Sequence, residues 1–326
     1  MLGRRSIWSN ERVIDLAALF VPATDEVWRL QNGNDPECRH FQKIADVGHY
    51  RHHRSTRQGI YVCTASGVLL GSMNSHNAEA VAQMLEDSLE QFAAMTLAER
   101  KLPADADIRP AHRWEESYQT DGLDLTMYAR DLPESCDPDE ESQPAWNQDR
   151  IWFSQAEAGS FLPPDRERLE AGAEYTLPSS LVTRIVRFSI IDTVRGQTTF
   201  YSPEEVADST IRATIESVSE NAITLRLSGQ TSAESAKSRG RDLPHGIRTQ
   251  LLGQATWNPN ARRFSSFEIV AVGTRWGRTV FNGRRSQLEE SPVGFVIQLT
   301  PADAPLVAPS FLWGYRAAWV KGPPRN

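Results

Sequence analysis

Residues 58–92 constrain the fold more than any other stretch of this chain. Two short apolar segments, residues 60–63 and 68–70, are separated by Ala65-Ser66-Gly67, which is typical of a turn between two antiparallel strands. After a short polar gap, apolar residues recur at helical spacing over residues 78–92, and acidic residues occupy the other face. The sequence therefore predicts a strand, a tight turn, a second strand and an amphipathic helix that Asn77 caps.

This order resembles the closing hairpin and last helix of a thioredoxin-like domain. In redox-active members of that family, a Cys-x-x-Cys pair opens the first long helix and a cis-proline faces it from the start of the hairpin. Here the helix start Asp35-Pro36-Glu37 is followed by the single Cys38, and Gln58-Gly59 stands in the place of the proline. The resemblance therefore implies a thioredoxin-like scaffold without the two features that make a redox activity specific.

The remainder of the chain divides by composition. A length of 326 residues is enough for two hydrophobic cores. Residues 99–177 are rich in proline, acidic residues and isolated aromatics, although residues 122–130 alternate as a strand would. We therefore expect a thioredoxin-like domain over residues 1–98, a connector over residues 99–177 that packs on its neighbours, and a second domain over residues 178–326.

The last part of the chain has the pattern of antiparallel strands. Residues 180–188, after Pro178, fit either a helix or a strand, and we favour the helix. Residues 210–215 and 223–227 alternate on either side of a turn, as do residues 249–257 and 264–272, and a late strand follows Pro292. The predicted fold class is therefore α+β, with a mainly antiparallel β domain curled into a barrel or sandwich.

Composition excludes several classes of protein. A net charge of −7 argues against a protein that binds nucleic acid through a basic surface. We also expect no membrane segment, since no run of about 18 apolar residues is present, and no secretory signal. Three widely spaced cysteines favour a reducing, cytoplasmic environment. Signatures of nucleotide-binding loops and serine hydrolases are missing, and no cofactor is indicated.

Cys38 is the sharpest candidate for catalysis. A thiol in the first turn of a helix faces unpaired amide groups, which stabilise a thiolate. Two acidic neighbours, Asp35 and Glu37, oppose that charge, and a lone cysteine is often a small buried hydrophobe. An enzyme of this kind would be a thiol-dependent oxidoreductase or peroxidase, with Cys63 or an external thiol resolving the intermediate. It requires Cys38 to be exposed and acidic.

Two basic clusters are candidates for binding. The first is an anion patch of His52, His53, Arg54 and Arg57. With His40, His49 and Cys38 nearby, a metal site is conceivable, but the spacing does not match a zinc site and the arginines would repel a cation, so none is assigned. The second cluster follows the late strands, where arginines stand beside an aromatic residue and glycines. Its predicted ligand-binding residues are Arg275, Trp276, Arg278, Asn282 and Arg284.

Two functional hypotheses remain open at this point. We favour a non-catalytic protein in which the thioredoxin-like domain is a scaffold and the β domain holds a small anionic ligand or a protein partner. The alternative is the thiol enzyme centred on Cys38. The first requires a concave site near Trp276 and Arg278, and the second requires a reactive thiol.

Overall fold

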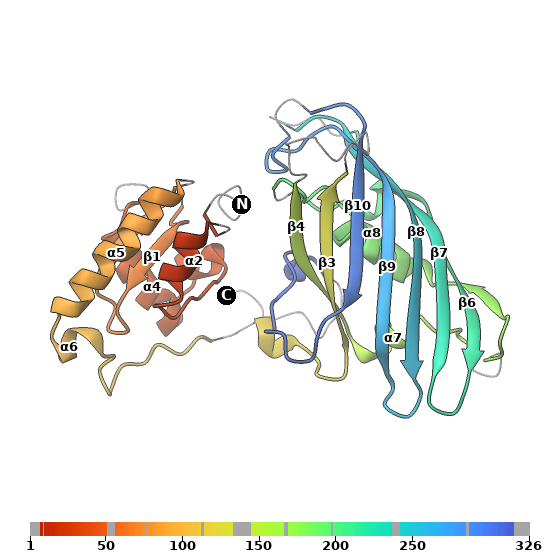
Figure 1. Ribbon diagram of the computed structural model, residues 1–326, viewed down its shortest axis with the longest axis horizontal. Coiled ribbons are helices and arrows are strands. Elements are labelled where there is room, and N and C mark those ends of the chain that lie inside the picture. The colour runs from red at the N-terminus through yellow and green to blue at the C-terminus, as the bar shows by residue number, and fades with distance from the viewer. Residues whose placement is uncertain are drawn as a thin grey trace. The chain divides into compact units, whose positions relative to one another are not determined.

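The computed structural model describes residues 7–8, 10–50, 56–75, 77–111, 114–132, 145–165, 169–196, 198–236, 242–284 and 287–315. The chain forms two compact units, Met1–Arg113 and Trp114–Asn326 (Figure 1).

Unit 1 is built from helices and one hairpin. The predicted N-caps are confirmed: the Asp35 side chain accepts from the Cys38 amide, and the Asn77 side chain accepts from the Ala80 amide. The hairpin and the amphipathic helix that follows it are also confirmed. In chain order the elements are α2 (Glu11–Ala17), α3 (Val27–Asn32), α4 (Pro36–Asp46), β1 (Ile60–Cys63), β2 (Leu69–Met73), α5 (Ala78–Ala94) and α6 (Leu97–Arg100).

The core of unit 1 lies where α5 packs against β2 and α2. It contains Val13, Val62, Val81 and Leu85. Gly71 allows this close packing, because a Cβ atom there would stand 2.7 Å from Met84 Cγ. The sheet of this unit has two strands in the part that the structure describes. The hairpin and closing helix are therefore present, whereas a thioredoxin-like domain stays a prediction.

Unit 2 is dominated by one antiparallel sheet of eight strands in the order β4-β3-β10-β9-β8-β7-β6-β5. Its strands are β3 (Leu123–Asp131), β4 (Trp146–Phe153), β5 (Glu174–Thr176), β6 (Val206–Val218), β7 (Ile223–Ser235), β8 (His245–Asn258), β9 (Arg263–Trp276) and β10 (Ser291–Leu299). Two short helices, α7 (Gln155–Gly159) and α8 (Ser179–Phe188), accompany them, with single turns of 3-10 helix at Trp114–Ser117, Pro203–Glu205 and Leu312–Gly314. The helical interpretation of residues 180–188 and both predicted hairpins are confirmed.

Alternation along the long strands gives the sheet one buried and one exposed face. In β8, Ile247 and Leu251 are buried, while the intervening Arg248 is exposed and Leu252 is 67% exposed. The sheet curves, and α8 lies against its buried face (Figure 1). Helix α8 contributes Leu181 and Val186 to the core. The amphipathic pattern that predicts each strand therefore also determines which face encloses the core.

The structure corrects the predicted connector and the predicted sheet architecture. Strands β3, β4 and β5 and helix α7 all fall within residues 99–177, and the division between units lies at Arg113/Trp114. Strand β3 enters the sheet by pairing with β10, from Asp131 opposite Val293 to Leu125 opposite Leu299. This pairing joins segments far apart in sequence, so composition gave no sign of it. The described strands form a single sheet with β4 and β5 at its edges, rather than a barrel or a sandwich.

None of the helices in the described part of the chain combines the length and the apolar character needed to cross a bilayer.

Candidate functional site

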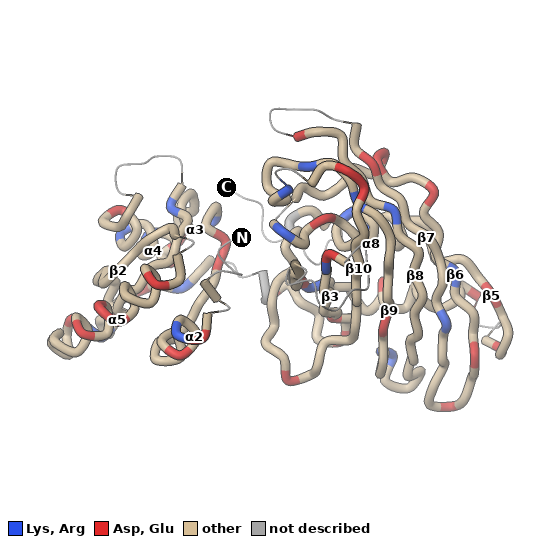
Figure 2. Tube along the Cα trace, turned by 45° about the horizontal axis from the view of Figure 1, so that its top comes forward, with Lys and Arg blue, Asp and Glu red and all other residues tan. Residues whose placement is uncertain are grey.

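Three of the predicted ligand-binding residues meet in a buried ionic network at one end of the sheet. Arg275 is the second-last residue of β9, and Asn282 and Arg284 lie in the segment that follows this strand. They meet Asp131, at the end of β3, and Asp192, which follows α8. Figure 2 shows basic and acidic residues close together in the loops at this end of the sheet. The network therefore joins three separate parts of unit 2.

The guanidinium group of Arg284 uses all its hydrogen-bond donors inside this network. Its Nε donates to Asp192 Oδ2 at 2.9 Å, and its Nη2 donates to Asp131 Oδ1 at 2.6 Å and Asp192 Oδ1 at 2.8 Å. Its Nη1 donates to Asp131 Oδ2 at 3.0 Å and to Gln287 Oε1 at 3.1 Å. An arginine has five N–H groups, so Arg284 has none left for a ligand. Its side chain is 1% exposed.

The network holds Asp131 in its ionised form. Burial raises the pKa of this carboxyl group, but hydrogen bonds and charge from Arg284 and Arg195 outweigh burial and leave the pKa below its ordinary value. Arg195 Nε donates to Asp131 Oδ2 at 2.6 Å. Two carboxylates and the arginines around them therefore stabilise one another as a structural unit.

The other residues predicted for this site have different surroundings. Arg275 is 1% exposed and donates from Nη1 to the Gln287 carbonyl, and burial followed by the charge of Arg284 lowers its pKa. Trp276 follows it on the opposite face, where Arg248 lies 4.7 Å from the ring centroid. Arg278 is partly buried. The predicted residues are therefore divided between two faces. Of the three that meet, Arg284 has all its donors engaged, whereas the buried Nε of Arg275 has no hydrogen-bond partner among the described residues.

The structure buries Cys38, the predicted nucleophile. Its side chain is completely buried, and Sγ lies 3.3 Å from Arg29 Nη1 and 3.4 Å from the Arg29 carbonyl oxygen. Burial and the neighbouring Asp35 raise the pKa of the Cys38 thiol to about 11. Cys63 is an exposed residue. Desolvation nevertheless raises the pKa of its thiol as well. Neither condition of the thiol hypothesis, exposure and acidity, holds at Cys38.

Most of the predicted anion patch, His52, His53 and Arg54, lies outside the described residues. Arg57 is described, and it pairs with Asp46 at 2.6 Å and donates to the Gln31 carbonyl. Within the described ranges, no group of three His, Cys, Asp or Glu side chains is arranged to hold a metal ion.

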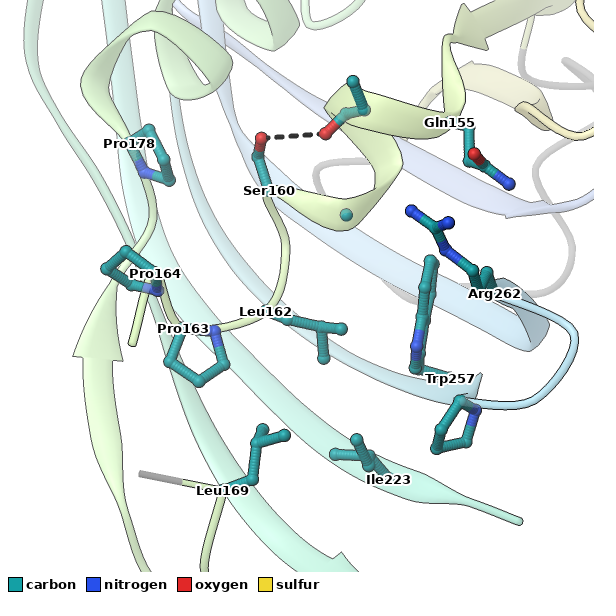
Figure 3. A pocket seen from close by; sticks show the side chains of 13 residues that line it. Gln155, Ser160, Leu162, Pro163, Pro164, Leu169, Pro178, Ile223, Trp257 and Arg262 are labelled. Atoms are coloured by element: carbon teal, nitrogen blue, oxygen red, sulfur yellow. Dashed lines mark hydrogen bonds between the residues drawn. The ribbon is translucent and has the colours of Figure 1, made fainter. Parts of the chain in front are cut away.

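A cavity of about 550 Å³ lies elsewhere in unit 2, and the sequence did not indicate it. Parts of α7, the start of β7, the end of β8 and the turn between β8 and β9 form its walls (Figure 3). Its lining residues are Gln155, Ala156, Gly159, Ser160, Leu162, Pro163, Pro164, Leu169, Pro178, Ile223, Trp257, Pro259 and Arg262.

Aromatic packing makes one wall of this cavity rigid. Trp257 pairs across the sheet with Ile223, and its ring contacts Phe264 with centroids 5.0 Å apart. Phe264 in turn packs edge to face against Phe161 and Phe267. Interlocked rings of this kind keep their orientation, so the cavity has a preformed wall.

The opposite wall is held by the short helix α7. Ser154 and Glu157 form a reciprocal capping box at its start, and Arg184 of α8 pairs with Glu157. Arg184 also lies between two rings, 4.7 Å from the centroid of Phe153 and 4.1 Å from that of Tyr315. Helix α7 is therefore fixed to α8, which holds this wall of the cavity in place.

Only fragments of this site were visible in the sequence. Residues 163–164 are both proline, and Asn258-Pro259-Asn260 indicates a turn. In comparisons with protein-family models, curated proteins and solved structures, no match to this chain was found.

Proposed function

We propose that the chain is a non-catalytic binding protein whose unit 2 takes a small, largely apolar molecule into the cavity beside Trp257. The observation that carries this proposal is the cavity itself, about 550 Å³ between interlocked aromatic rings and an anchored helix. Binding sites for small molecules commonly have volumes of roughly 300–1,000 Å³ and mainly apolar walls. Nine of the 13 lining residues are Ala, Leu, Ile, Pro or Trp.

The proposal retains the binding hypothesis that the sequence favoured. It places the binding site in the cavity beside Trp257 instead of at the arginine cluster. Arg284 supports the end of the sheet, because its partners Asp131 and Asp192 belong to the same chain. A thioredoxin-like scaffold in unit 1 and a cytoplasmic location remain predictions that this function is compatible with. The thiol enzyme is not proposed, since Cys38 is buried and its pKa is raised.

Binding can be tested with the full chain and the neutral fluorophore N-phenyl-1-naphthylamine, whose emission rises in apolar surroundings. Ala156→Phe places a large ring in the cavity from an exposed position of α7. We expect saturable fluorescence with the natural chain, and at least a tenfold loss of affinity in this variant. The matched control is Ala302→Phe, because Ala302 is also exposed in unit 2 but does not line the cavity.

Two outcomes would overturn the proposal: fluorescence that does not saturate, or equal affinities for the natural chain and Ala156→Phe. Circular dichroism of both variants separates lost binding from lost folding.

A further inference from the structure

The described lining of the cavity carries positive charge only. Among the described lining residues, Arg262 is the single charged side chain, and no carboxylate contributes to the walls. The polar side chains beside it are Gln155 and Ser160, and the Ser160 hydroxyl already donates to the Ala156 carbonyl. Among the described residues, a molecule in this cavity would therefore meet apolar walls and the guanidinium group of Arg262.

The turn between β8 and β9 holds Arg262 in an unusual conformation. Its φ angle is 52°, in the left-handed region that favours glycine or asparagine. The turn is fixed locally, because the Ala261 amide donates to Asn258 Oδ1 at 2.9 Å, and it is tied to the neighbouring β6–β7 turn by Asn260 Nδ2, 2.7 Å from Asn221 Oδ1. Figure 3 shows the Arg262 side chain beside Trp257, with its guanidinium group on the side of the cavity where α7 and Gln155 lie.

We infer that the ligand of this cavity is a monocarboxylate with an apolar body, and that Arg262 is the residue that selects it. The inference rests on the proposed function. A guanidinium group offers two parallel N–H donors that match the two oxygens of a carboxylate, and the Gln155 amide can donate a further bond. The apolar body would lie along Leu162, Ile223 and Trp257.

Charge balance favours a carboxylate over a phosphate. One arginine compensates one negative charge, whereas a phosphate monoester carries nearly two at neutral pH and would need a second cation. The described lining supplies no second cation. A cationic ligand would be repelled by Arg262, and the described lining offers no carboxylate to offset that repulsion.

The test compares four ligands with the same ten-carbon chain: decanoate, decanol, decyl phosphate and decyltrimethylammonium. Each is tested for its ability to displace N-phenyl-1-naphthylamine from the full chain, at low ionic strength and below its micelle concentration or solubility limit. We expect decanoate to bind about tenfold more tightly than decanol, as a charge-assisted pair would produce. The cationic compound should bind most weakly.

Variants at the adjacent residues Arg262 and Arg263 test which arginine produces the preference for decanoate over decanol. Arg262→Gln should bind decanoate and decanol equally while keeping the decanol affinity of the natural chain, and Arg262→Lys should keep part of the preference. Arg263→Gln is the matched control, since Arg263 is exposed at the start of β9, next to Arg262, but does not line the cavity. It should keep the full preference for decanoate.

The outcomes distinguish failure of the proposed function from failure of the inferred ligand class. If neither the fluorophore nor any ten-carbon ligand binds, the proposed function fails. If decanol and decanoate bind the natural chain equally, or if decyl phosphate binds best, the cavity is a binding site but the inferred ligand class is wrong. Loss of the preference in Arg263→Gln would also overturn the assignment to Arg262.

Discussion

Replacing Arg284 by methionine should be one of the most damaging single changes in unit 2. The Arg284 side chain is 1% exposed, and its partners Asp131 and Asp192 are 12% and 9% exposed. The substitution keeps an apolar stem but leaves two poorly hydrated carboxylates without their shared cation. Removal of one partner from a buried ion pair typically costs about 3–5 kcal/mol.

This cost corresponds to a decrease in Tm of about 6–20 °C for a domain of this size. It should depend on pH in a definite direction. In the natural chain the pKa of Asp131 is below its ordinary value, so its contribution to stability is present above a pH of about 4 and is lost as the pH falls further.

In Arg284→Met, ionised Asp131 should destabilise the fold, which is the opposite of its effect in the natural chain. Burial, which raises the pKa, is then opposed by the half-buried Arg195 alone. A carboxyl group whose folded pKa is raised destabilises the fold when ionised, and protonation relieves that cost. The difference in stability between variant and natural chain should therefore shrink as the pH is lowered from about 7 to about 4.

The assay is urea unfolding followed by circular dichroism at several pH values. Arg226→Met is the matched control, because Arg226 pairs with Glu216 at 3.5 Å with the side chains 57% and 35% exposed, and its removal should cost at most about 1 kcal/mol. The triple variant Asp131→Asn, Asp192→Asn, Arg284→Met should recover part of the loss, since no ionised carboxylate is left unpaired. Equal costs for Arg284→Met and Arg226→Met at pH 7, or a cost that does not change with pH, would refute this account of the network.

Four further expectations follow from individual residues. Cys38 should resist alkylation in the folded chain until the pH approaches its raised pKa of about 11, while the exposed Cys63 reacts earlier, as peptide mass spectrometry would show; fast reaction of Cys38 at pH 7 would revive the thiol hypothesis. Phe161→Ala should cost about 3–5 kcal/mol in chemical denaturation, because the ring is 1% exposed and packs against three others. Arg262→Asn should raise stability by about 0.5–1 kcal/mol while removing the preference for carboxylates, since asparagine tolerates the left-handed conformation; a lower Tm would contradict this. Asn77→Ala should lower the stability of unit 1 by about 1 kcal/mol through loss of the α5 cap, and Asn77→Ser should restore most of it.

The chain's local patterns predicted those elements whose physical cause is itself local. Asp35 and Asn77 indicated helix starts because a capping side chain needs only the amide three residues ahead. The β6–β7 and β8–β9 hairpins were predictable because each pair of strands is adjacent in sequence and alternates against one core. The helix α8 was less certain, since a short apolar run suits either kind of element.

The sequence also supplied the residue types of the arginine cluster, but not what they do. Arg275, Asn282 and Arg284 do meet, as a ligand-binding cluster would require. Their partner Asp131 stands 153 positions from Arg284 and reaches it because β3 pairs with β10. A pattern of basic residues cannot reveal which acids will neutralise it, because that depends on long-range strand order.

The sequence by itself determined the amphipathic strands, the capped helices and the presence of two cores, since these follow from residue spacing and backbone chemistry. Tertiary structure alone decided the strand order, the burial of Cys38, the pairing of Arg284 and the cavity beside Trp257. The physical reason is that burial, charge compensation and empty space are properties of segments brought together from distant positions. A local pattern specifies the face that each segment offers, and packing decides what that face meets.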